Sequence, residues 1–339
     1  MLGELSVKLS IIILVWNDKK VIFDCLKSIY ASTHKIDFEI IVSDNGSTDG
    51  SIERIRQEYP KVRILENGSN LRFAKGNNVA IDISHGEYVL ILNPDTLIHE
   101  GALDTIVAYA DSHPEGGAFS CRVLNSDGTF QGCIRPLPTV RSEWCLALGL
   151  GQVSRFIPAL SIGEYVGWDG KDERKVGWLA GCFILIRGEL VKKLRGFDPQ
   201  FFYYFEDTDL CHRVWDAGYT IRYYPGCSIT HLGGMSTIGR FTPISFALDA
   251  AVTRYLYYYK YFGMSGIESC RNAVLVGSKI RRAWFGLVQM LHPTDAGAKK
   301  LELLHNLDEW HSRVDLHKLV ERGEEPEIAL KPSDRVLER

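Results

Sequence analysis

The sequence predicts an α/β fold built on a mostly parallel central sheet with helices on its faces. Short apolar runs rich in Ile, Val and Leu recur through roughly the first 100 residues, and helix-like segments long enough for crossover connections separate them. Strands that alternate with helices in this way form parallel sheets covered on both faces. No apolar stretch approaches the ~20 residues that a membrane-spanning helix needs.

The individual elements follow from these runs and from the turn signals between them. Expected strands are 9–16, 38–43, 62–66 and 87–93, and expected helices are 19–31, 48–58 and 73–84. Further along the chain we expect a strand and turn within 117–133, a buried strand at 177–187, a helix starting at Glu206, and a strand at 221–225. The segment 134–172, with its Pro, Gly and apolar residues, fits either a loop over a binding site or a surface excursion.

Composition excludes several classes of protein. The 339 residues are 45% hydrophobic and 24% charged, which are ordinary globular values. The formal net charge of −3 argues against a nucleic-acid binder, although residues 251–300 carry a local charge of +6. Neither G-x-G-x-x-G nor a P-loop occurs. The eight scattered cysteines form no C-x-x-C pair and suit buried free thiols in a reducing cytoplasm, and the N-terminus lacks the pattern of a signal peptide.

Polar side chains follow the carboxyl ends of the expected strands, the edge at which open α/β sheets bind ligands. They are Asn17, Asp44, Asn67 with Asn70, and Asn93 with Asp95. In DNGSTDGS, a turn and a helix N-cap account for Asn45 to Asp49 but not for a carboxylate ending an apolar strand. Asp44 is suited to accept a hydrogen bond from a ribose hydroxyl or from N3–H of uracil or thymine.

The Asn93-Pro94-Asp95 segment has a structural and a functional interpretation. Alone, it is an ordinary turn that ends a strand. A diphosphate-bound cation, however, needs a hard oxygen ligand, and Mg²⁺ takes only one or two carboxylates from the protein. Asp95 is the candidate ligand, and Asn93 is a weaker polar contact.

Glu206 and Asp207 follow the aromatic run FFYYF and open a helix. Acidic residues in a first turn complement the helix dipole, and that alone could account for them. Apolar surroundings, however, raise the pKa of a carboxylate and suit it to accept a proton as a general base. Aromatic surfaces also suit the face of a sugar.

Two later features each have two interpretations. His231, beside Gly233 and Gly234, is either a structural histidine or a ligand that completes a metal site, more naturally for Mn²⁺ than for Mg²⁺. The basic and aromatic segment 254–262, with the residues that follow it, is either a helical pair that packs its aromatic residues on the main domain or a surface that contacts an anionic membrane. Those following residues are Arg271, Lys279, Arg281, Arg282, Trp284 and Phe285.

From about Leu9 to Ser236 the chain resembles the inverting glycosyltransferases of family 2, which have the GT-A fold, and within them the bacterial rhamnosyltransferases. The motifs that show the resemblance are SIIILVWND, IIVSDNGSTDGS, NLRFAKGNNVAI, GEYVLILNPDT, GWLAGCFILIR, GFDPQFFYYFEDTDLCHR and THLGGMST. The resemblance implies that Asp44 contacts the nucleoside, that Asp95 and His231 bind Mg²⁺ or Mn²⁺, and that Asp207 is the catalytic base. Asn93 departs from the Asp of the family's D-x-D, which puts metal dependence in question. Expected substrate contacts are Asn17, Asp44, Asn70, Lys75, Asn93, Trp178 and Glu206.

The resemblance also implies a domain plan and a reaction. Residues 1–240 would form the transferase domain, with a donor half at about 1–125 and an acceptor half at about 126–240, and 241–339 a helical region that resembles no family we recognise. L-rhamnose would move from dTDP-rhamnose to a hydroxyl of a glycan or of a polyprenyl-diphosphate-linked saccharide, in the cytoplasm or on the inner face of its membrane. The alternatives are a UDP-hexose donor, a nucleotidyltransferase, whose Gly-rich phosphate loop is lacking, and a sugar-nucleotide-binding protein without activity.

Overall fold

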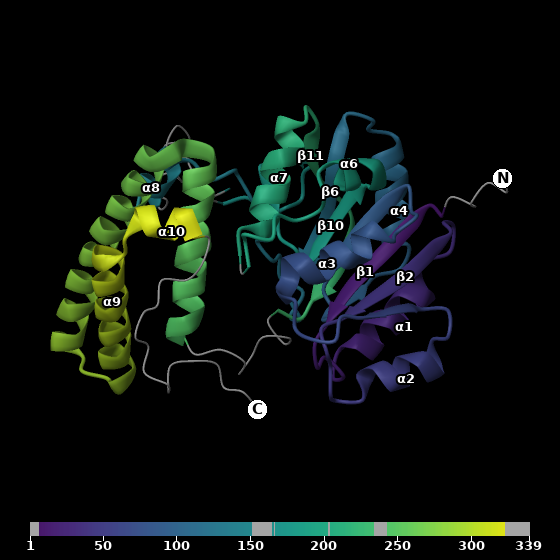
Figure 1. The fold of residues 1–339 in the computed structure, drawn as a ribbon, viewed down its shortest axis with the longest axis horizontal. Coiled ribbons are helices and arrows are strands. Elements are labelled where there is room, and N and C mark those ends of the chain that lie inside the picture. The colour runs from purple at the N-terminus through teal and green to yellow at the C-terminus, as the bar shows by residue number, and fades with distance from the viewer. Residues whose placement is uncertain (1–6, 151–164, 166, 203, 234–242, 323–339) are drawn as a thin grey trace. The chain divides into compact units, whose positions relative to one another are not determined.

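The computed structural model describes residues 7–150, 165, 167–202, 204–233 and 243–322 (Figure 1). The chain divides into two compact units. Unit 1 consists of Met1–Arg135, Trp168–Phe202 and Glu206–Ile238, and unit 2 of Pro136–Gly167, Tyr203–Phe205 and Gly239–Arg339. Residues 136–167 therefore group with the C-terminal helices, while the division of 1–240 into donor and acceptor halves stays a prediction.

Unit 1 is an α/β fold around a nine-stranded mixed sheet, as the sequence predicts. The strand order is β3-β2-β1-β4-β10-β6-β11-β5, with β8 paired to β11. These strands are β1 (Leu9–Val15), β2 (Phe38–Asp44), β3 (Arg63–Glu66), β4 (Tyr88–Leu92), β5 (Thr96–Ile98), β6 (Gly116–Leu124), β8 (Arg174–Lys175), β10 (Phe183–Arg187) and β11 (Thr220–His231). The first four strands are parallel, and the antiparallel β10 joins them to β6.

Helices connect the strands of unit 1, and their apolar sides help to form its core (Figure 1). They are α1 (Ile22–Ser32), α2 (Ser51–Glu58), α3 (Arg72–Asp82), α4 (Ala102–Asp111), α6 (Gly188–Lys193) and α7 (Glu206–Asp216). β4 is buried along its whole length and β1 almost so, which explains why both read as continuous apolar runs rather than alternating ones.

Two expected strands differ from the observed ones. The apolar stretch 177–187 is two strands, because the chain turns at Ala180–Cys182, so that β9 (Trp178–Leu179) pairs with β7 (Ile134–Arg135) in a separate small sheet. The strand expected at 221–225 continues to His231 as β11, which has an irregular register between Tyr224 and Ser228. That continuation brings His231 opposite Thr96 of β5.

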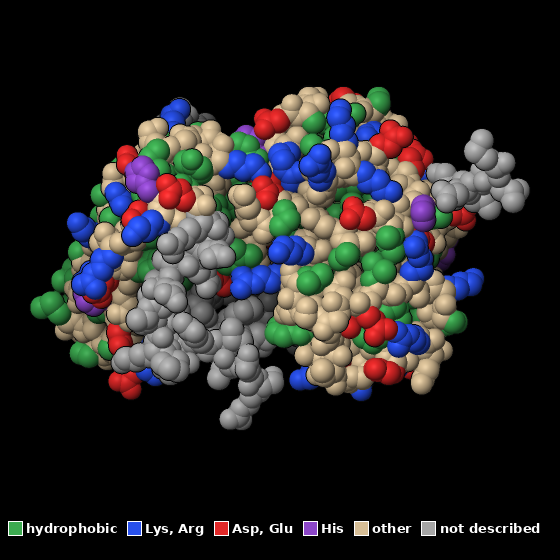
Figure 2. All heavy atoms as spheres, in the orientation of Figure 1, with side chains coloured by type: hydrophobic (Ala, Val, Ile, Leu, Met, Phe, Trp, Pro, Cys, Tyr) green, Lys and Arg blue, Asp and Glu red, His purple; other side chains and the backbone are tan. Residues whose placement is uncertain are grey.

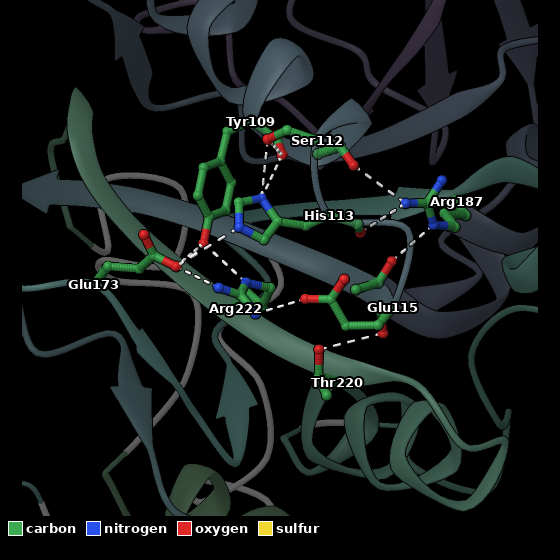
Figure 3. A network of polar contacts seen from close by, with 10 residues as sticks. Tyr109, Ser112, His113, Glu115, Glu173, Arg187, Thr220 and Arg222 are labelled. Atoms are coloured by element: carbon green, nitrogen blue, oxygen red, sulfur yellow. Dashed lines mark hydrogen bonds and ion pairs between the residues drawn. The ribbon is translucent and has the colours of Figure 1, made fainter.

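A polar network holds the sheet at the edge where β6 and β11 begin (Figure 3). Arg222 donates to the Tyr109 hydroxyl at 2.8 Å and to Glu115 at 2.7 Å, and it also pairs with Glu173. Arg187 donates to the Gly116 carbonyl at 2.7 Å. Since His231 lies at the other end of β11, this network supports the fold away from the polar strand ends.

Unit 2 is helical where it is described. Its helices are α5 (Val140–Ala147), α8 (Pro243–Leu291), α9 (Asp295–Arg313) and α10 (Leu316–Arg322). The long α8 is kinked at Gly263, whose φ of 65° is unfavourable for other residues. Tyr255 and Tyr258 are fully buried and form hydrogen bonds with His311 and Glu143, so both tyrosines pack within unit 2. None of the described helices combines the length and apolarity that a membrane crossing requires.

Candidate active site

Asp95 and His231 meet at the ends of β4 and β11. The antiparallel pairing of β5 with β11 aligns His231 with Thr96, and the Leu232 N–H donates to the Asp95 carbonyl at 2.9 Å. His231 Nε2 then lies 3.2 Å from Asp95 Oδ1. The sequence named both residues as metal ligands, and the sheet brings them together.

The Asp95 carboxylate is 1% exposed, and neither of its oxygens accepts a hydrogen bond from a described residue. A buried carboxylate in that state is costly unless a positive charge lies beside it. Burial opposes the charged form of His231, but Asp95 and the Cys133 thiol outweigh it and raise the pKa of His231 to about 9. Asp95 and His231 are therefore paired through a proton on the histidine. A divalent cation bound to the same oxygen and nitrogen would supply the positive charge in place of that proton.

Two amide side chains orient the His231 ring. Gln131 Oε1 lies 2.8 Å from Nδ1, and Asn93 Nδ2 lies 3.3 Å from Nε2. A carbonyl oxygen only accepts, so Nδ1 carries the proton that is donated to Gln131. In the neutral ring, this tautomer leaves the Nε2 lone pair facing Asn93 and Asp95, as a metal ligand requires.

Asp207 is held by backbone N–H groups at the start of α7. Gly181 N–H donates to Oδ2 at 3.1 Å, and Thr208 N–H donates to Oδ1 at 2.6 Å. Burial raises the pKa of Asp207 to about 6, although these hydrogen bonds act to lower it. A carboxylate fixed in orientation with that pKa is suited to accept a proton near neutral pH.

Glu206, the neighbouring acid, is 8% exposed, and its Oε2 atom has no hydrogen-bond partner among the described residues. Burial, together with the charge of Asp207, raises the pKa of Glu206 well above its usual value. Tyr204 and Phe205 immediately before it have φ of 62° and 64°, an unfavourable conformation for such residues. Strain of this kind is typical of functional sites, where surrounding structure maintains it.

The loop leading to Glu206 is attached to α3. The Asn78 side chain donates to the Phe197 carbonyl and accepts from the Phe197 N–H, both at 2.8 Å. Phe73 packs edge-on against Phe197, with ring centroids 5.4 Å apart. The NLRFAKGNNVAI motif therefore helps to position the FEDTD motif about 120 residues later in the chain.

Asp44 and Asn17 form a second polar group at the ends of β2 and β1. Both Asp44 carboxylate oxygens lie within hydrogen-bonding distance of the Ser47 N–H, at 3.0 and 3.2 Å. Asn17 Oδ1 accepts from the Thr48 N–H at 2.7 Å, and Asn17 has a φ of 56°. The DNGST turn is thus fixed by the two residues that the sequence assigns to substrate. Because β1 pairs with both β2 and β4, this group and the Asp95 group lie along one edge of the sheet.

The remaining expected substrate residues are less closely grouped. Asn70 Oδ1 accepts from Asn45 Nδ2 at 3.1 Å and from the Arg72 N–H at 2.8 Å, which links it to the Asp44 turn. Lys75 is exposed on α3. Trp178 is partly exposed in β9, opposite Arg135. Only Asn70 joins either group through a side-chain contact given by the structure.

Gln131, Cys133, Cys182 and the Gly181 N–H also border this site, and the sequence singled out none of them. The two thiols looked like ordinary buried cysteines, and only the break between β9 and β10 brings Gly181 to Asp207. Hydrogen bonding with Cys182 lowers the pKa of Cys133 to about 6, helped by His231 and opposed by burial. An Asn-Ser-Asp-Gly turn just before Gln131 was the available signal, since it returns the chain to the end of β6.

The arrangement combines a buried carboxylate paired with a histidine, a second carboxylate held by backbone N–H groups, and a polar turn at the adjacent strand ends. Such a site is suited to transfer a group away from a diphosphate to a hydroxyl.

Comparison with known proteins agrees with this chemistry. The family model described as glycosyl transferase family 2 matches residues 10–142. The N-acetylglucosaminyl-diphospho-decaprenol L-rhamnosyltransferase of Mycobacterium tuberculosis is 29% identical over 223 residues, which cover 58% of this chain and 67% of that protein. The rhamnosyltransferase WbbL of Escherichia coli is 30% identical over 204 residues, covering 57% of this chain and 72% of WbbL.

Solved structures confirm the fold. A mannosyltransferase from Pyrobaculum calidifontis, in complex with GDP-Man and Mn²⁺, superposes with a TM-score of 0.53 at 15% identity, covering 90% of this chain and 87% of that one. TarS of S. aureus in complex with UDP-GlcNAc gives 0.50 at 15% identity, covering 92% and 84%. The chain therefore belongs to glycosyltransferase family 2 and is a glycosyltransferase with the GT-A fold.

Proposed function

We propose that this enzyme transfers L-rhamnose from dTDP-L-rhamnose to a hydroxyl of a lipid-linked saccharide, with inversion at the anomeric carbon. The observation that carries the proposal is the buried Asp95 carboxylate 3.2 Å from His231 Nε2, in the same site as Asp207. Relatives named as L-rhamnosyltransferases support the sugar, and the printed name of one of them supports a diphospho-lipid acceptor.

Asp95 and His231 would hold a divalent cation, and Asn93 would orient the histidine. The donor set fits, because a carboxylate oxygen and an imidazole nitrogen 3.2 Å apart lack a positive partner other than a proton. An imidazole ligand favours Mn²⁺ over Mg²⁺. Bound there, the cation would neutralise charge on the donor's diphosphate as it departs.

Asp207 would accept the proton of the attacking acceptor hydroxyl. The Gly181 and Thr208 N–H groups fix both carboxylate oxygens, so the base keeps one orientation. Burial and the charge of Asp207 raise the pKa of Glu206, and in its protonated form Glu206 can donate a hydrogen bond to a sugar hydroxyl. A single displacement from the face opposite the nucleotide inverts the anomeric centre and needs no covalent nucleophile.

Asp44 would recognise the nucleoside. The Ser47 N–H holds the Asp44 carboxylate in place and leaves its other lone pairs to accept from thymine N3–H or a ribose hydroxyl. Asn17, which ties its own turn to that of Ser47, would position the same part of the donor. Lys75, Asn70 and Trp178 remain proposed substrate contacts on the grounds of the motifs that contain them.

A lipid-linked acceptor calls for a surface that approaches a membrane, and unit 2 presents one. On α8, Ile280, Trp284, Leu287 and Leu291 are 47%, 63%, 51% and 67% exposed, and their spacing places them on one helical face. Exposed Lys279 and Arg281 flank this face, and Figure 2 shows hydrophobic and basic side chains interspersed over unit 2. We propose that this face lies in the interface of an anionic bilayer, where each basic residue adds ~1 kcal/mol.

Vesicle sedimentation tests the membrane contact. Replacing Trp284 and Leu287 together by Ser should reduce binding to vesicles of phosphatidylglycerol and phosphatidylcholine at least tenfold. Leu148→Ser, at an exposed apolar residue outside this face, is the matched control and should bind like the wild type. Equal binding by wild type and the double variant would contradict the proposal.

Calorimetric binding of donors tests the transferase assignment without the acceptor. We expect dTDP-rhamnose to bind more tightly than UDP-glucose, UDP-galactose or GDP-mannose, and Mn²⁺ to strengthen that binding. Asp95→Asn should abolish the effect of Mn²⁺, since the isosteric amide keeps the shape and loses the charge. Tighter binding of a UDP-sugar would contradict the proposal that dTDP-rhamnose is the donor. Donor binding that Mn²⁺ does not change would contradict the proposed metal site.

A further inference from the structure

Three side chains with soft ligand atoms converge beside Asp95. Cys133 precedes β7, Cys182 precedes β10, and His231 ends β11. Their ligand atoms all lie within 4.8 Å of one another. Of the three, only His231 belongs to the proposed donor site, so the two thiols have no role in the reaction described above.

The backbone fixes the two cysteines close together. The Ala180 N–H donates to the Cys133 carbonyl at 2.9 Å, and the Asn93 N–H donates to the Cys182 carbonyl at 3.2 Å. A tetrahedral Zn²⁺ with Zn–S bonds of about 2.3 Å separates two sulfur ligands by about 3.8 Å. Because the two sulfur atoms lie within 4.8 Å of one another, side-chain rotations that bring them closer by about 1 Å or less would place them at this separation.

The chemistry of this set differs from that of the donor's cation site. Two thiolates and an imidazole favour a thiophilic ion such as Zn²⁺, whereas Mg²⁺ and Mn²⁺ favour oxygen ligands. Three protein ligands leave a fourth position, and Asp95 Oδ1 lies 3.2 Å from His231 Nε2. Gln131 Oε1 supports the set from outside, because it accepts from His231 Nδ1 at 2.8 Å and so leaves Nε2 for the metal. Its 3.0 Å contact with Cys133 Sγ needs the thiol proton and is lost when Zn²⁺ binds.

We propose that Cys133, Cys182 and His231 bind Zn²⁺, and that this binding inhibits sugar transfer. Zn²⁺ binding displaces the thiol protons to solvent and leaves the oxidation state of both sulfurs unchanged. Because both cation sites use His231, a protein with Zn²⁺ bound has no histidine for the donor's cation. The inhibition rests on the proposed function, whereas the binding does not.

Cobalt substitution tests the binding with the full-length protein. The metal-free protein, kept reduced, should bind one Co²⁺ with a thiolate-to-cobalt charge-transfer band in the near ultraviolet, and Zn²⁺ should displace it. Cys133→Ser with Cys182→Ser should abolish the band and weaken Zn²⁺ binding at least ~100-fold, the top of the range for losing an outer-sphere partner. Cys145→Ser with Cys227→Ser removes two cysteines outside the cluster and should leave the band unchanged.

The proposed zinc site would be refuted if the wild-type protein showed no thiolate-to-cobalt band. It would also be refuted if the band persisted in the Cys133/Cys182 variant. Circular dichroism and thermal unfolding show whether that variant is folded. Where transfer is measured, the variant's rate, relative to its own rate without Zn²⁺, should resist Zn²⁺ concentrations that inhibit the wild type, and unchanged inhibition would contradict the shared use of His231. A wild-type band in a protein that binds no nucleotide-sugar would leave the zinc site standing and refute the proposed function instead.

Discussion

Asp207, the proposed catalytic base, accepts hydrogen bonds from two backbone N–H groups. Burial disfavours its charged form, and the N–H groups of Gly181 and Thr208 favour it. The resulting pKa of about 6 is higher than that of an exposed aspartate but still below neutral pH. The base would be ionised at neutral pH and still able to hold a proton in the transition state.

The pH dependence of kcat/KM follows from that value. A base must be unprotonated in the free enzyme, so kcat/KM should fall as the pH drops through about 6 and reach a plateau above it. Asp207→Asn should lower kcat by ~10²–10⁴-fold and remove this acid limb. A profile of kcat/KM between pH 5 and 8 measures both, and a limb retained in the Asn variant would assign the titration to another group.

Gln131 is a positioning residue that acts through His231. Gln131→Leu should weaken Mn²⁺ binding by ~10–100-fold, because the ring loses the acceptor that sets its tautomer. Gln131→Glu keeps an acceptor oxygen and should restore most of the affinity. Calorimetric titration of Mn²⁺ with donor present provides the measurement, and equal affinities in the Leu and Glu variants would show that the contact with Nδ1 is unimportant.

At the level of elements, α7 carries the catalytic candidates and is attached to the chain at the end of α6 by the side chain of Arg213, which also forms an ion pair with the buried Asp209 within α7. Arg213 donates to Asp209 at 2.7 Å and to the carbonyls of Leu194 and Gly196 at 2.8 Å, and Asp209 is fully buried. The i,i+4 spacing of the two residues is visible in the sequence, whereas the carbonyl contacts are not. They depend on the left-handed Arg195 and Gly196 that end α6.

Arg213→Met should lower the free energy of unfolding by ~3–5 kcal/mol, because it leaves the buried Asp209 carboxylate without its charged partner. The matched control is Arg54→Met in α2, which breaks an i,i+4 pair with Glu58 whose two side chains are each 46% exposed. That change should alter stability far less. Urea unfolding of both variants tests the contrast, and similar losses would show that burial does not govern this pair.

Sequence patterns located most elements of unit 1 but not the ones that complete the site. β1 to β4 and α1 to α3 lie within one to three residues of the expected bounds, because apolar periodicity and turn residues act locally. The break at Ala180–Cys182 lies inside an unbroken apolar run, so hydrophobicity alone could not reveal it. The placement of Gly181 on Asp207, and of Cys182 beside Cys133, depends on pairing between strands far apart in the sequence.

At the level of the whole molecule, the candidate site residues belong to unit 1, and the described part of unit 2 is mostly helical. Asp44, Asp95, Asp207 and His231 could be chosen from the sequence because each follows a strand or opens a helix in a recognisable motif. The exposed face of α8 could not be identified from the sequence. Residues 254–258 are mostly buried and residues 280–291 are largely exposed, yet both segments are apolar and basic in sequence. Packing within unit 2 alone distinguishes them.

The central claim is a single displacement at the anomeric carbon with Asp207 as base. Its most direct test is the anomeric configuration of the product formed from dTDP-β-L-rhamnose and a GlcNAc-diphospho-lipid acceptor, read by nuclear magnetic resonance. The account predicts an α-L-rhamnoside from the wild type and almost no product from Asp207→Asn. A β-L-rhamnoside, or an Asn variant as fast as the wild type, would contradict it.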